Sequence, residues 1–434
     1  MSNVEEAADL DRVNQTRERV VLLTLAAVQF TSIVDFMVIM PLGPQLMRSL
    51  DIGPAQFGLV VSSYTLAAGM AGLVATSLVD RLGRKAAFLG LDAGFLVGTL
   101  LCGLAPTYTT LVLARLATGA FGGILGGMAM AIIGDVFPEA RRGRATGTFM
   151  GAFALASVVG VPFGLYLGTR FGWHAPFLVL AGLGFPVLAI AAATMPPLRG
   201  HIGQASTAHP LKLLLETFSH PKHLNAFALL VMLMFAGFVV FPYVSPYLVA
   251  NVGLAEDKLP LIFVAGGILT LFTAPLVGRL ADRYGKLRVF RLVAPASAVM
   301  TLAVTNLPPV GVTVAVATVA ALMVSNSGRM VPAMAMVTGS VAPDRRGGFM
   351  SASSSVQHLA AGFATYIGGL VIVESEDGRL QHFGVVGLMA VCATLLSLWL
   401  AGRLRSADSD VVTTPGRSMA AAAEALCDAG EPLG

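Results

Sequence analysis

The sequence predicts an all-α, polytopic membrane protein with twelve transmembrane helices in two pseudo-symmetric six-helix bundles. Of its 434 residues, 56% are hydrophobic and 12% are charged, which is about half the charge of an average soluble domain. Apolar runs of about 20 residues, enough to cross the hydrocarbon core as a helix, recur about a dozen times. A polar loop, Asp80 to Lys85, returns as Asp282 to Lys286, and this repeat indicates two related halves.

The expected spans follow one another with short connections. In the first half they cover residues 20–47, 57–79, 86–104, 110–135, 144–168 and 176–196, and in the second half 224–250, 259–280, 288–307, 310–338, 350–373 and 384–402. The predicted domains are therefore a tail at 1–19, a bundle at 20–196, a linker at 197–223, a bundle at 224–402 and a tail at 403–434. The composition of the last tail predicts disorder.

The repeat extends beyond the polar loop. Arg142-Gly143 returns as Arg346-Gly347, and Pro41 with Pro44 returns as Pro242 with Pro246. Such spacing predicts two halves in the same orientation, related by an axis along the membrane normal. In the linker between them, Leu211, Leu214, Leu215 and Phe218 would share one helical face. That face suits a helix lying on the membrane surface, or the linker is a solvated tether with local helix.

The positions of the cations predict the topology. Most of the 28 Lys and Arg residues fall in the tails, the linker and the loops at 80–85, 137–145 and 278–291, which all lie on one side of the predicted fold. Because Lys and Arg are biased toward cytoplasmic loops, we expect both termini to be cytosolic and the protein to lie in the cell membrane. The formal net charge of +4 does not indicate nucleic-acid binding, since topology places the cations and aromatic residues do not interleave with them.

Three motifs carry a family resemblance. The loop Gly278-x-Leu280-Ala281-Asp282-Arg283-x-Gly285-Lys286 resembles the loop signature of the major facilitator superfamily, and Asp80 to Lys85 is similar to its first-half counterpart, with Thr76 in the place of a Gly. Leu111-x-x-x-Arg115-x-x-x-Gly119 and Gly160-Val161-Pro162-Phe163-Gly164 resemble motifs of that family's twelve-helix drug and proton antiporters, including the arabinose-efflux-like bacterial permeases. The second has the form Gly-x-Pro-x-Gly where the fuller pattern is Gly-Pro-x-x-Gly. The resemblance covers nearly the whole chain.

The resemblance implies that the paired loops form a cytosolic gate. This gate ties the second predicted span, 57–79, to the eleventh, 350–373, when that side is closed. The residues expected to take part are Asp80, Arg81, Gly83, Arg84, Lys85, Asp135, Arg142, Gly278, Asp282, Arg283, Gly285 and Lys286. Gly83 would let the chain turn sharply. The alternative is that these charges only set the topology. Topology depends on Lys and Arg, however, so it does not account for the Asp and the turn Gly of each loop.

Ionisable residues at membrane depth are few, and each is a functional candidate because a charge at mid-helix costs about 2.5 to 3.5 kcal/mol on insertion scales. Asp35 lies on a polar arc of helix 1 and is predicted to carry the coupling proton; a structural hydrogen bond is the alternative. Arg115 is implicated by the resemblance in proton transfer and is predicted to act on Asp35. Its alternative is to snorkel to the outer surface. For Asp92 we expect a local gate or snorkelling role.

The substrate cavity is predicted to include polar residues of both halves. These are Gln29, Ser32, Tyr243, Tyr247, Asn326, Arg329, Gln357 and His358. Neither Arg329 nor His358 has an acidic partner in its predicted surroundings, so these two are expected to contact substrate or the cytosolic gate. For His358, a packed hydrogen bond between helices is favoured over proton coupling.

The Gly160 to Gly164 motif, in the fifth predicted span, is predicted to make a contact between the two halves, as the resemblance implies. Gly160, Pro162 and Gly164 would permit a bend or close packing there. A plain packing kink is the alternative.

These features predict a secondary transporter that exports a drug-like or amphipathic small molecule in exchange for protons. Sugar or metabolite efflux and proton-coupled uptake are the alternatives. Met128, Met130, Met330, Met334, Tyr243 and Tyr247 favour an amphipathic ligand, because sugars need several amides and acids. The sequence has no nucleophile and base on one face, no metal cluster, no channel filter and no ATP-binding loop. We therefore expect no enzymatic activity and no metal or cofactor. In the absence of an ATP-binding loop, we expect the proton gradient to supply the energy. We also expect the protein to be a monomer.

Overall fold

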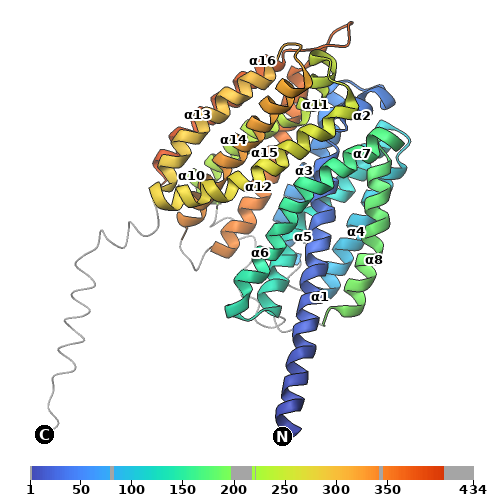
Figure 1. The fold of residues 1–434 in the computed structure, drawn as a ribbon, viewed down its shortest axis with the longest axis vertical. Helices are drawn as coiled ribbons and strands as arrows, with labels where there is room; N and C mark the ends of the chain where they lie inside the picture. Colours follow the sequence, from blue (N-terminus) through green and yellow to red (C-terminus); the bar gives the residue numbers. More distant parts are fainter. Residues whose placement is uncertain (1, 79–82, 197–217, 220, 342–345, 405–434) are drawn as a thin grey trace, which may run out of the picture.

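The computed structural model describes residues 2–78, 83–196, 218–219, 221–341 and 346–404. Asp80 and Arg81, most of the predicted linker helix and nearly all of the predicted disordered tail lie outside these residues. Within the described part the chain is almost entirely helical, as predicted (Figure 1).

The first half consists of long helices joined by short connections. Its elements are α1 (Ser2–Val38), α2 (Gly43–Leu50), α3 (Pro54–Leu78), α4 (Arg84–Leu104), α5 (Tyr108–Val136), α6 (Glu139–Leu155), α7 (Val161–Phe171) and α8 (Ala175–Thr194). A π-helical turn, η2 (Ala156–Gly160), joins α6 to α7. It directly precedes Pro162, which has no N–H to donate to the preceding turn, so the helix widens there instead of breaking.

The second half also has six spans, but its interruptions lie in the first of them, whereas α15, the counterpart of α6 and α7, is continuous. Its elements are α10 (Pro221–Phe238), η3 (Phe241–Tyr243), α11 (Val244–Tyr247), η4 (Leu248–Val252), η5 (Glu256–Lys258), α12 (Leu259–Tyr284), α13 (Lys286–Thr305), α14 (Val312–Gly339), α15 (Arg346–Val371) and α16 (Phe383–Arg403). Pro242 and Pro246 break the seventh span into short pieces. The connection from α15 to α16 forms a small antiparallel pair of strands, β1 (Val373–Glu374) and β2 (Leu380–Gln381), which the sequence did not predict.

Of the helices described, 11 are long and apolar enough to cross a membrane. The helix that completes the predicted twelve is α15, which has 26 residues and is therefore long enough to span. It is more polar than the others because a run of Ser, Gln and His occupies residues 351–358. The predicted all-α, polytopic fold is confirmed.

The two halves meet at one end of the molecule and diverge at the other (Figure 1). Where they meet, a side-chain carbon placed on Gly43 would lie 2.8 Å from Pro246 Cγ, and one on Gly58 would lie 2.3 Å from the Tyr243 hydroxyl. We name this the predicted outer end, because the sequence places α2 outside. The end that carries the Arg84 and Gly285 loops is the predicted cytosolic end.

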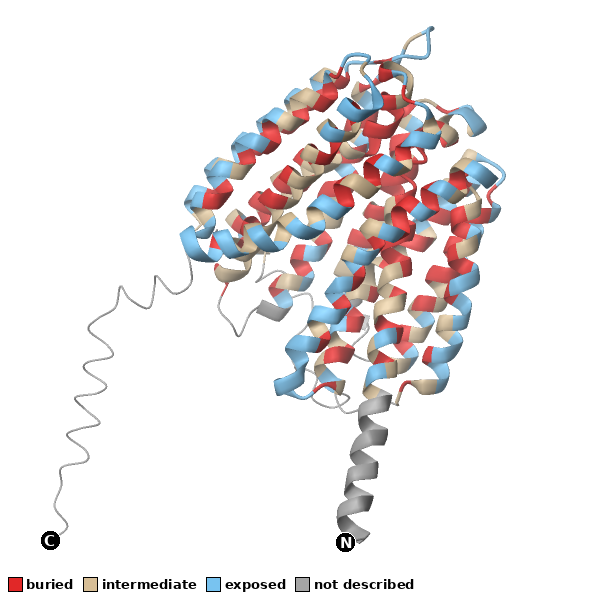
Figure 2. Ribbon diagram, in the orientation of Figure 1, coloured by how far each residue is buried: buried red, intermediate tan, exposed pale blue. Residues whose placement is uncertain are grey.

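Burial follows the contact between helices and not the average polarity of each helix. Figure 2 shows the buried residues concentrated where helices face one another, with exposed residues on the outward faces. Many of the exposed residues are large and apolar, such as Leu292 at 76% and Phe272 at 71% exposure. Such an apolar outer surface is expected of a protein that is surrounded by lipid.

Candidate functional site

Asp35 of α1 and Arg115 of α5 form an ion pair in the interior of the first half. Arg115 Nη1 lies 2.7 Å from Asp35 Oδ2, and both side chains are fully buried. The same nitrogen also donates to the Asp35 backbone carbonyl at 3.4 Å. Thr99 of α4 donates its hydroxyl to Asp35 Oδ1 at 3.1 Å. Three helices therefore hold this carboxylate.

Small residues of α5 bring Arg115 close to its neighbours. A side-chain carbon on Gly119 would lie 2.2 Å from the backbone oxygen of Tyr64, so α5 approaches α3 at backbone distance. The Arg115 guanidinium consequently lies over the Tyr64 ring, 4.5 Å from its centroid. A cation over an aromatic face is stabilised by the ring quadrupole, and this contact fixes the position of Arg115 in the pair.

The geometry excludes one alternative for Arg115 and leaves part of its guanidinium available. Because Arg115 is fully buried, it does not snorkel to the surface. Among the residues that the structure describes, its Nε and Nη2 atoms have no hydrogen-bond partner. Asp35 is the only ionic partner of Arg115 among the described residues. Protonation of Asp35 would therefore leave a buried cation uncompensated, which is costly in a low-dielectric interior.

Asp92 of α4 lies in a different environment. Its side chain is 1% exposed, so it does not snorkel either. Both of its carboxyl oxygens are buried without a hydrogen-bond partner in the described part of the chain. It is a second buried carboxyl group in the first half, separate from the Asp35 pair.

A cavity of about 500 Å³ lies between the two halves. Its lining comes mainly from α1, α6, η2, α10, α12 and α14, and includes Met37, Phe153, Ser157, Val158, Leu233, Met234, Gly237, Phe238, Phe241, Phe263, Gly267, Thr270, Met323, Asn326, Arg329 and Met330. This volume is in the usual range for small-molecule sites. The walls are mostly apolar and aromatic, with a few polar groups.

Asn326 and Arg329 are the two predicted cavity residues that line this cavity. Arg329 is 4% exposed and donates from Nη1 to the Thr394 hydroxyl of α16 at 2.8 Å. Asn326 accepts a hydrogen bond from Ser297 at 2.8 Å. Both side chains are therefore held by neighbouring helices of the second half.

The other predicted cavity residues are not among those that line it. Tyr243 and Tyr247 are buried, and their hydroxyls donate to the backbone carbonyls of Thr365 at 2.6 Å and Leu307 at 3.0 Å. Gln357 donates to the Ser353 carbonyl within its own helix. Gln29, Ser32 and His358 lie on α1 and α15. In this conformation Tyr243 packs where the halves meet, with its ring centroid 6.0 Å from that of Phe57 of α3, whereas Tyr247 packs against Phe383 of the second half.

The Gly160 to Gly164 motif of the fifth predicted span lies where η2 passes into α7, and both of these elements contact α12 of the second half. A side-chain carbon on Gly160 would lie 2.2 Å from Val34, and one on Gly164 would lie 2.7 Å from Val38. Both glycines therefore face α1 within the first half. The closest approach to the second half is at the start of η2, where a side-chain carbon on Gly267 of α12 would lie 3.1 Å from the Ser157 carbonyl.

The described gate residues of the first half interact within that half. Arg84 pairs with Asp135, with Nε 3.0 Å from Oδ2, Lys85 donates to the Met195 carbonyl at 2.7 Å, and Arg142 donates to the Gly134 carbonyl at 2.9 Å. Gly83 has φ −58°, which any residue can adopt. The backbone at Gly83 therefore does not itself require a glycine.

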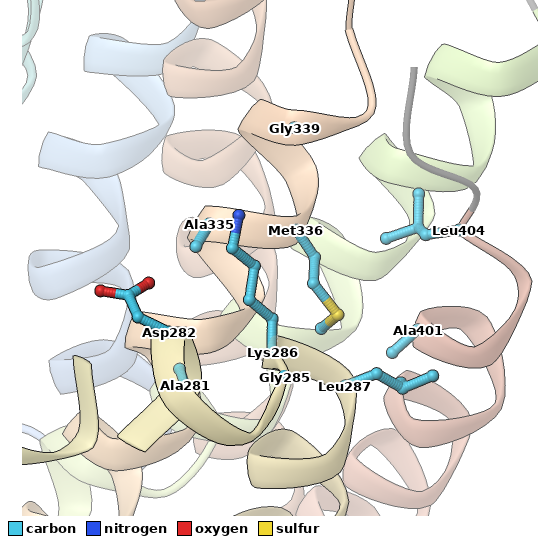
Figure 3. A pocket seen from close by; sticks show the side chains of 10 residues that line it. All are labelled: Ala281, Asp282, Gly285, Lys286, Leu287, Ala335, Met336, Gly339, Ala401 and Leu404. Atoms are coloured by element: carbon cyan, nitrogen blue, oxygen red, sulfur yellow. The ribbon is translucent and has the colours of Figure 1, made fainter. Parts of the chain in front are cut away.

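The loop of the second half contains a backbone position that favours glycine. Gly285 has φ 95°, a conformation that favours glycine. Asp282, Gly285 and Lys286 line a pocket of about 440 Å³ with residues of α14 and the end of α16 (Figure 3). Gly278 and Arg283 lie in the last turns of α12. Lys286 extends toward Gly339, the last residue of α14, where the helix dipole favours a cation.

Three contacts were not predicted from the sequence, two at the site and one at the predicted outer end. Thr99 and Thr394, which bind Asp35 and Arg329, gave no signal because a Thr in an apolar helix is common and its partner lies on another helix. Arg48 also pairs with Glu256 across the predicted outer end, and this hydrogen bond raises the pKa of the Arg48 guanidinium. The opposite charges of these two outer loops were the available signal.

Comparison with known proteins agrees with this architecture. The family model of the Major Facilitator Superfamily matches residues 25–365 and 226–426. The MFS-type transporter YceJ of Bacillus subtilis (strain 168) is 27% identical over 378 residues, which are 86% of this chain and 93% of YceJ. The inner membrane transport protein YdhP of Escherichia coli (strain K12) is 28% identical over 245 residues, covering 56% of this chain and 62% of YdhP.

Solved structures show the same fold. A bacterial homologue of the human lysosomal transporter Spinster, in an inward-facing and unoccupied conformation, has a TM-score of 0.72 at 17% identity, over 89% of this chain and 97% of the homologue. The nucleoside transporter NupG has a TM-score of 0.68 at 15% identity, over 88% of this chain and 99% of NupG. The chain belongs to the major facilitator superfamily, a family of membrane transporters and not of enzymes.

Proposed function

We propose that this transporter exports an amphipathic small molecule across the cell membrane in exchange for protons, and that Asp35 carries the proton. The observation that carries this proposal is the buried ion pair of Asp35 with Arg115, whose atoms lie 2.7 Å apart. A carboxyl group that can accept a proton, and a cation that responds to it, are what coupling to a proton gradient requires.

The pair offers two states with different electrostatics. With Asp35 ionised, Arg115 is neutralised and the two helices are held together. When Asp35 binds a proton, the ionic attraction between α1 and α5 is lost and Arg115 remains as an uncompensated buried charge. Each state would favour a different arrangement of α1, and α1 also contributes Met37 to the cavity wall. A change in protonation can thus bias the conformation of the cavity.

The cavity supports an amphipathic substrate. Its wall is dominated by Met, Phe, Leu and Val side chains, with Asn326, Thr270 and Arg329 as polar groups. A cavity for a sugar would need several amides and acids around the ligand. The same cavity lies where η2 and α12 meet, so movement of one half against the other would change its access.

The proposed orientation places both termini and the gate loops in the cytosol, with no cofactor beyond the proton gradient and a monomer as the working unit. The positive-inside bias of the loops supports this orientation. In the same scheme Asp80 contributes to closing the cytosolic side, where a charge-assisted hydrogen bond is about twice as strong as a neutral one.

The test is proton release on substrate binding. A compound chosen by susceptibility profiling of a deletion strain is added to purified protein in weakly buffered detergent, and the pH change is recorded. Asp35→Asn keeps the shape of the side chain but has no proton to release, so the signal should disappear. Asp51→Asn, at an exposed carboxyl near the predicted outer end, is the matched control and should behave as wild type. Undiminished release from Asp35→Asn would assign coupling to another group.

A further inference from the structure

Arg329 is a buried cation that has no ionic partner among the residues that the structure describes. It is 4% exposed, and its hydrogen bond among the described residues goes to the neutral hydroxyl of Thr394. Among those residues, the acids of the second half are Glu256, Asp257, Asp282, Glu374, Glu376 and Asp377, which all lie in loops or near helix ends. Removing a charge from water without a partner is costly, so this arginine is held in an unfavourable state.

The guanidinium of Arg329 is directed toward the cavity between the halves. Its Nη1 atom donates a hydrogen bond to the Thr394 hydroxyl. Its Nη2 atom lies 3.7 Å from the point where a side-chain carbon on Gly237 would be. Gly237 and Arg329 both line the cavity, and the described lining residues include no other charged side chain. The Thr270 hydroxyl, on the same wall, is buried without a hydrogen-bond partner. The cavity thus offers a cation and a free hydroxyl among apolar side chains.

We propose that the substrate of this transporter is an amphipathic organic anion, and that Arg329 binds its carboxylate or other acidic group. This inference rests on the proposed function for the idea of an exported small molecule and adds its charge. The acidic group would supply the counter-charge that the protein lacks, through charge-assisted hydrogen bonds to the guanidinium. The apolar body would lie against the Met and Phe side chains of the wall.

Other ligand charges fit this cavity less well. An organic cation would face Arg329 at close range with no carboxylate in the lining to offset the repulsion, and like charges in a low-dielectric site repel strongly. A neutral amphipathic molecule could occupy the apolar wall but would leave the cation unpaired. The expected order of affinity is therefore anion, then neutral compound, then cation.

Three compounds that share the dansyl group test this order. Dansylglycine is an anion, dansylglycinamide is neutral and dansylcadaverine is a cation, and the dansyl fluorescence reports transfer to an apolar site. Binding is measured to the full chain in nanodiscs, with empty nanodiscs as the background. We expect wild type to bind dansylglycine about tenfold or more tightly than dansylglycinamide, and Arg329→Gln to remove this difference while it keeps the affinity for the amide.

Three further variants keep the test decisive. Arg288→Gln removes an exposed cation of α13 and should retain the anion preference, which excludes a general effect of net charge. Gly237→Leu places a large side chain in the cavity beside Arg329 and should weaken all three compounds, whereas Gly237→Ala should not. The proposal is overturned if dansylcadaverine binds as tightly as dansylglycine, if Arg329→Gln retains the preference, or if wild type binds no dansylglycine.

The outcome is separate from that of the proton-release test, because dansyl binding requires no coupling. If Asp35→Asn still releases protons but the anion preference holds, the proposed coupling residue is wrong and the anion site stands. If the preference is absent while Asp35→Asn abolishes proton release, the proposed anion site is wrong and the proposed coupling residue stands.

Discussion

In the part of the chain that the structure describes, two arginines are buried. They lie in corresponding helices of the two halves, yet they have different partners. Arg115 of α5 is neutralised by Asp35 inside the protein, whereas Arg329 of α14 finds only the hydroxyl of Thr394 among the described residues. A pair that is complete in the protein can respond to a proton without any substrate. A cation that lacks its counter-ion can instead be completed by a ligand. The duplicated fold thus carries two unlike electrostatic sites.

The largest effect is expected from Arg115→Gln. This change leaves Asp35 buried without its cation, and breaking a buried ion pair by removing one partner costs about 3 to 5 kcal/mol. Thermal unfolding of the purified protein should show a large loss of stability. The double variant Asp35→Asn with Arg115→Gln should recover part of it, because no unpaired charge is left. Equal stability of Arg115→Gln and wild type would show that the pair contributes nothing to the fold.

A smaller loss is expected from Thr99→Val. The hydroxyl of Thr99 donates to Asp35 Oδ1 at 3.1 Å, and a hydrogen bond to a charged group contributes about 1.5 to 3 kcal/mol. The variant should therefore be less stable than wild type when Asp35 is charged, but not in the Asp35→Ala background. A cycle of these two substitutions, measured by chemical denaturation, isolates the interaction. An unchanged effect in both backgrounds would mean that Thr99 acts through packing alone.

Thr394→Asp makes the second site resemble the first. An aspartate at this position can pair with Arg329, so the protein itself would supply the counter-ion. The tenfold preference for dansylglycine over its amide, equal to about 1.4 kcal/mol, should disappear. Thr394→Asn, which has a similar shape and no charge, is the control and should keep the preference. If the aspartate variant binds the anion as wild type does, Arg329 is not the group that recognises it.

The smallest change in stability is expected from Arg329→Gln. The substitution loses a hydrogen bond worth about 0.5 to 1.5 kcal/mol, but it also removes an uncompensated buried charge, so the two effects offset each other. The unfolding midpoint should stay close to that of wild type even though anion binding is lost. A loss of stability as large as that of Arg115→Gln would reveal a partner for Arg329 and would remove the contrast between the two sites.

The class of protein and its two-half plan could be predicted from the sequence. A bilayer requires about 20 apolar residues per helix and penalises charge at depth, so hydropathy and the few buried ionisable residues are visible in the chain itself. Asp35 and Arg115 were found in this way. The polar α15 was also predicted as a span, although its composition is less apolar than that of the 11 other helices.

Only the tertiary structure decided which side chains meet. Whether Tyr243 faces the cavity or a backbone carbonyl, whether Gly160 faces α1 or α12, and whether Thr394 reaches Arg329 all depend on the rotation and depth of each helix. These are set by packing between helices, and residues far apart in sequence determine them jointly. The backbone likewise differs between Gly83, with φ −58°, and Gly285, with φ 95°. The similar sequences of the two loops did not predict this difference.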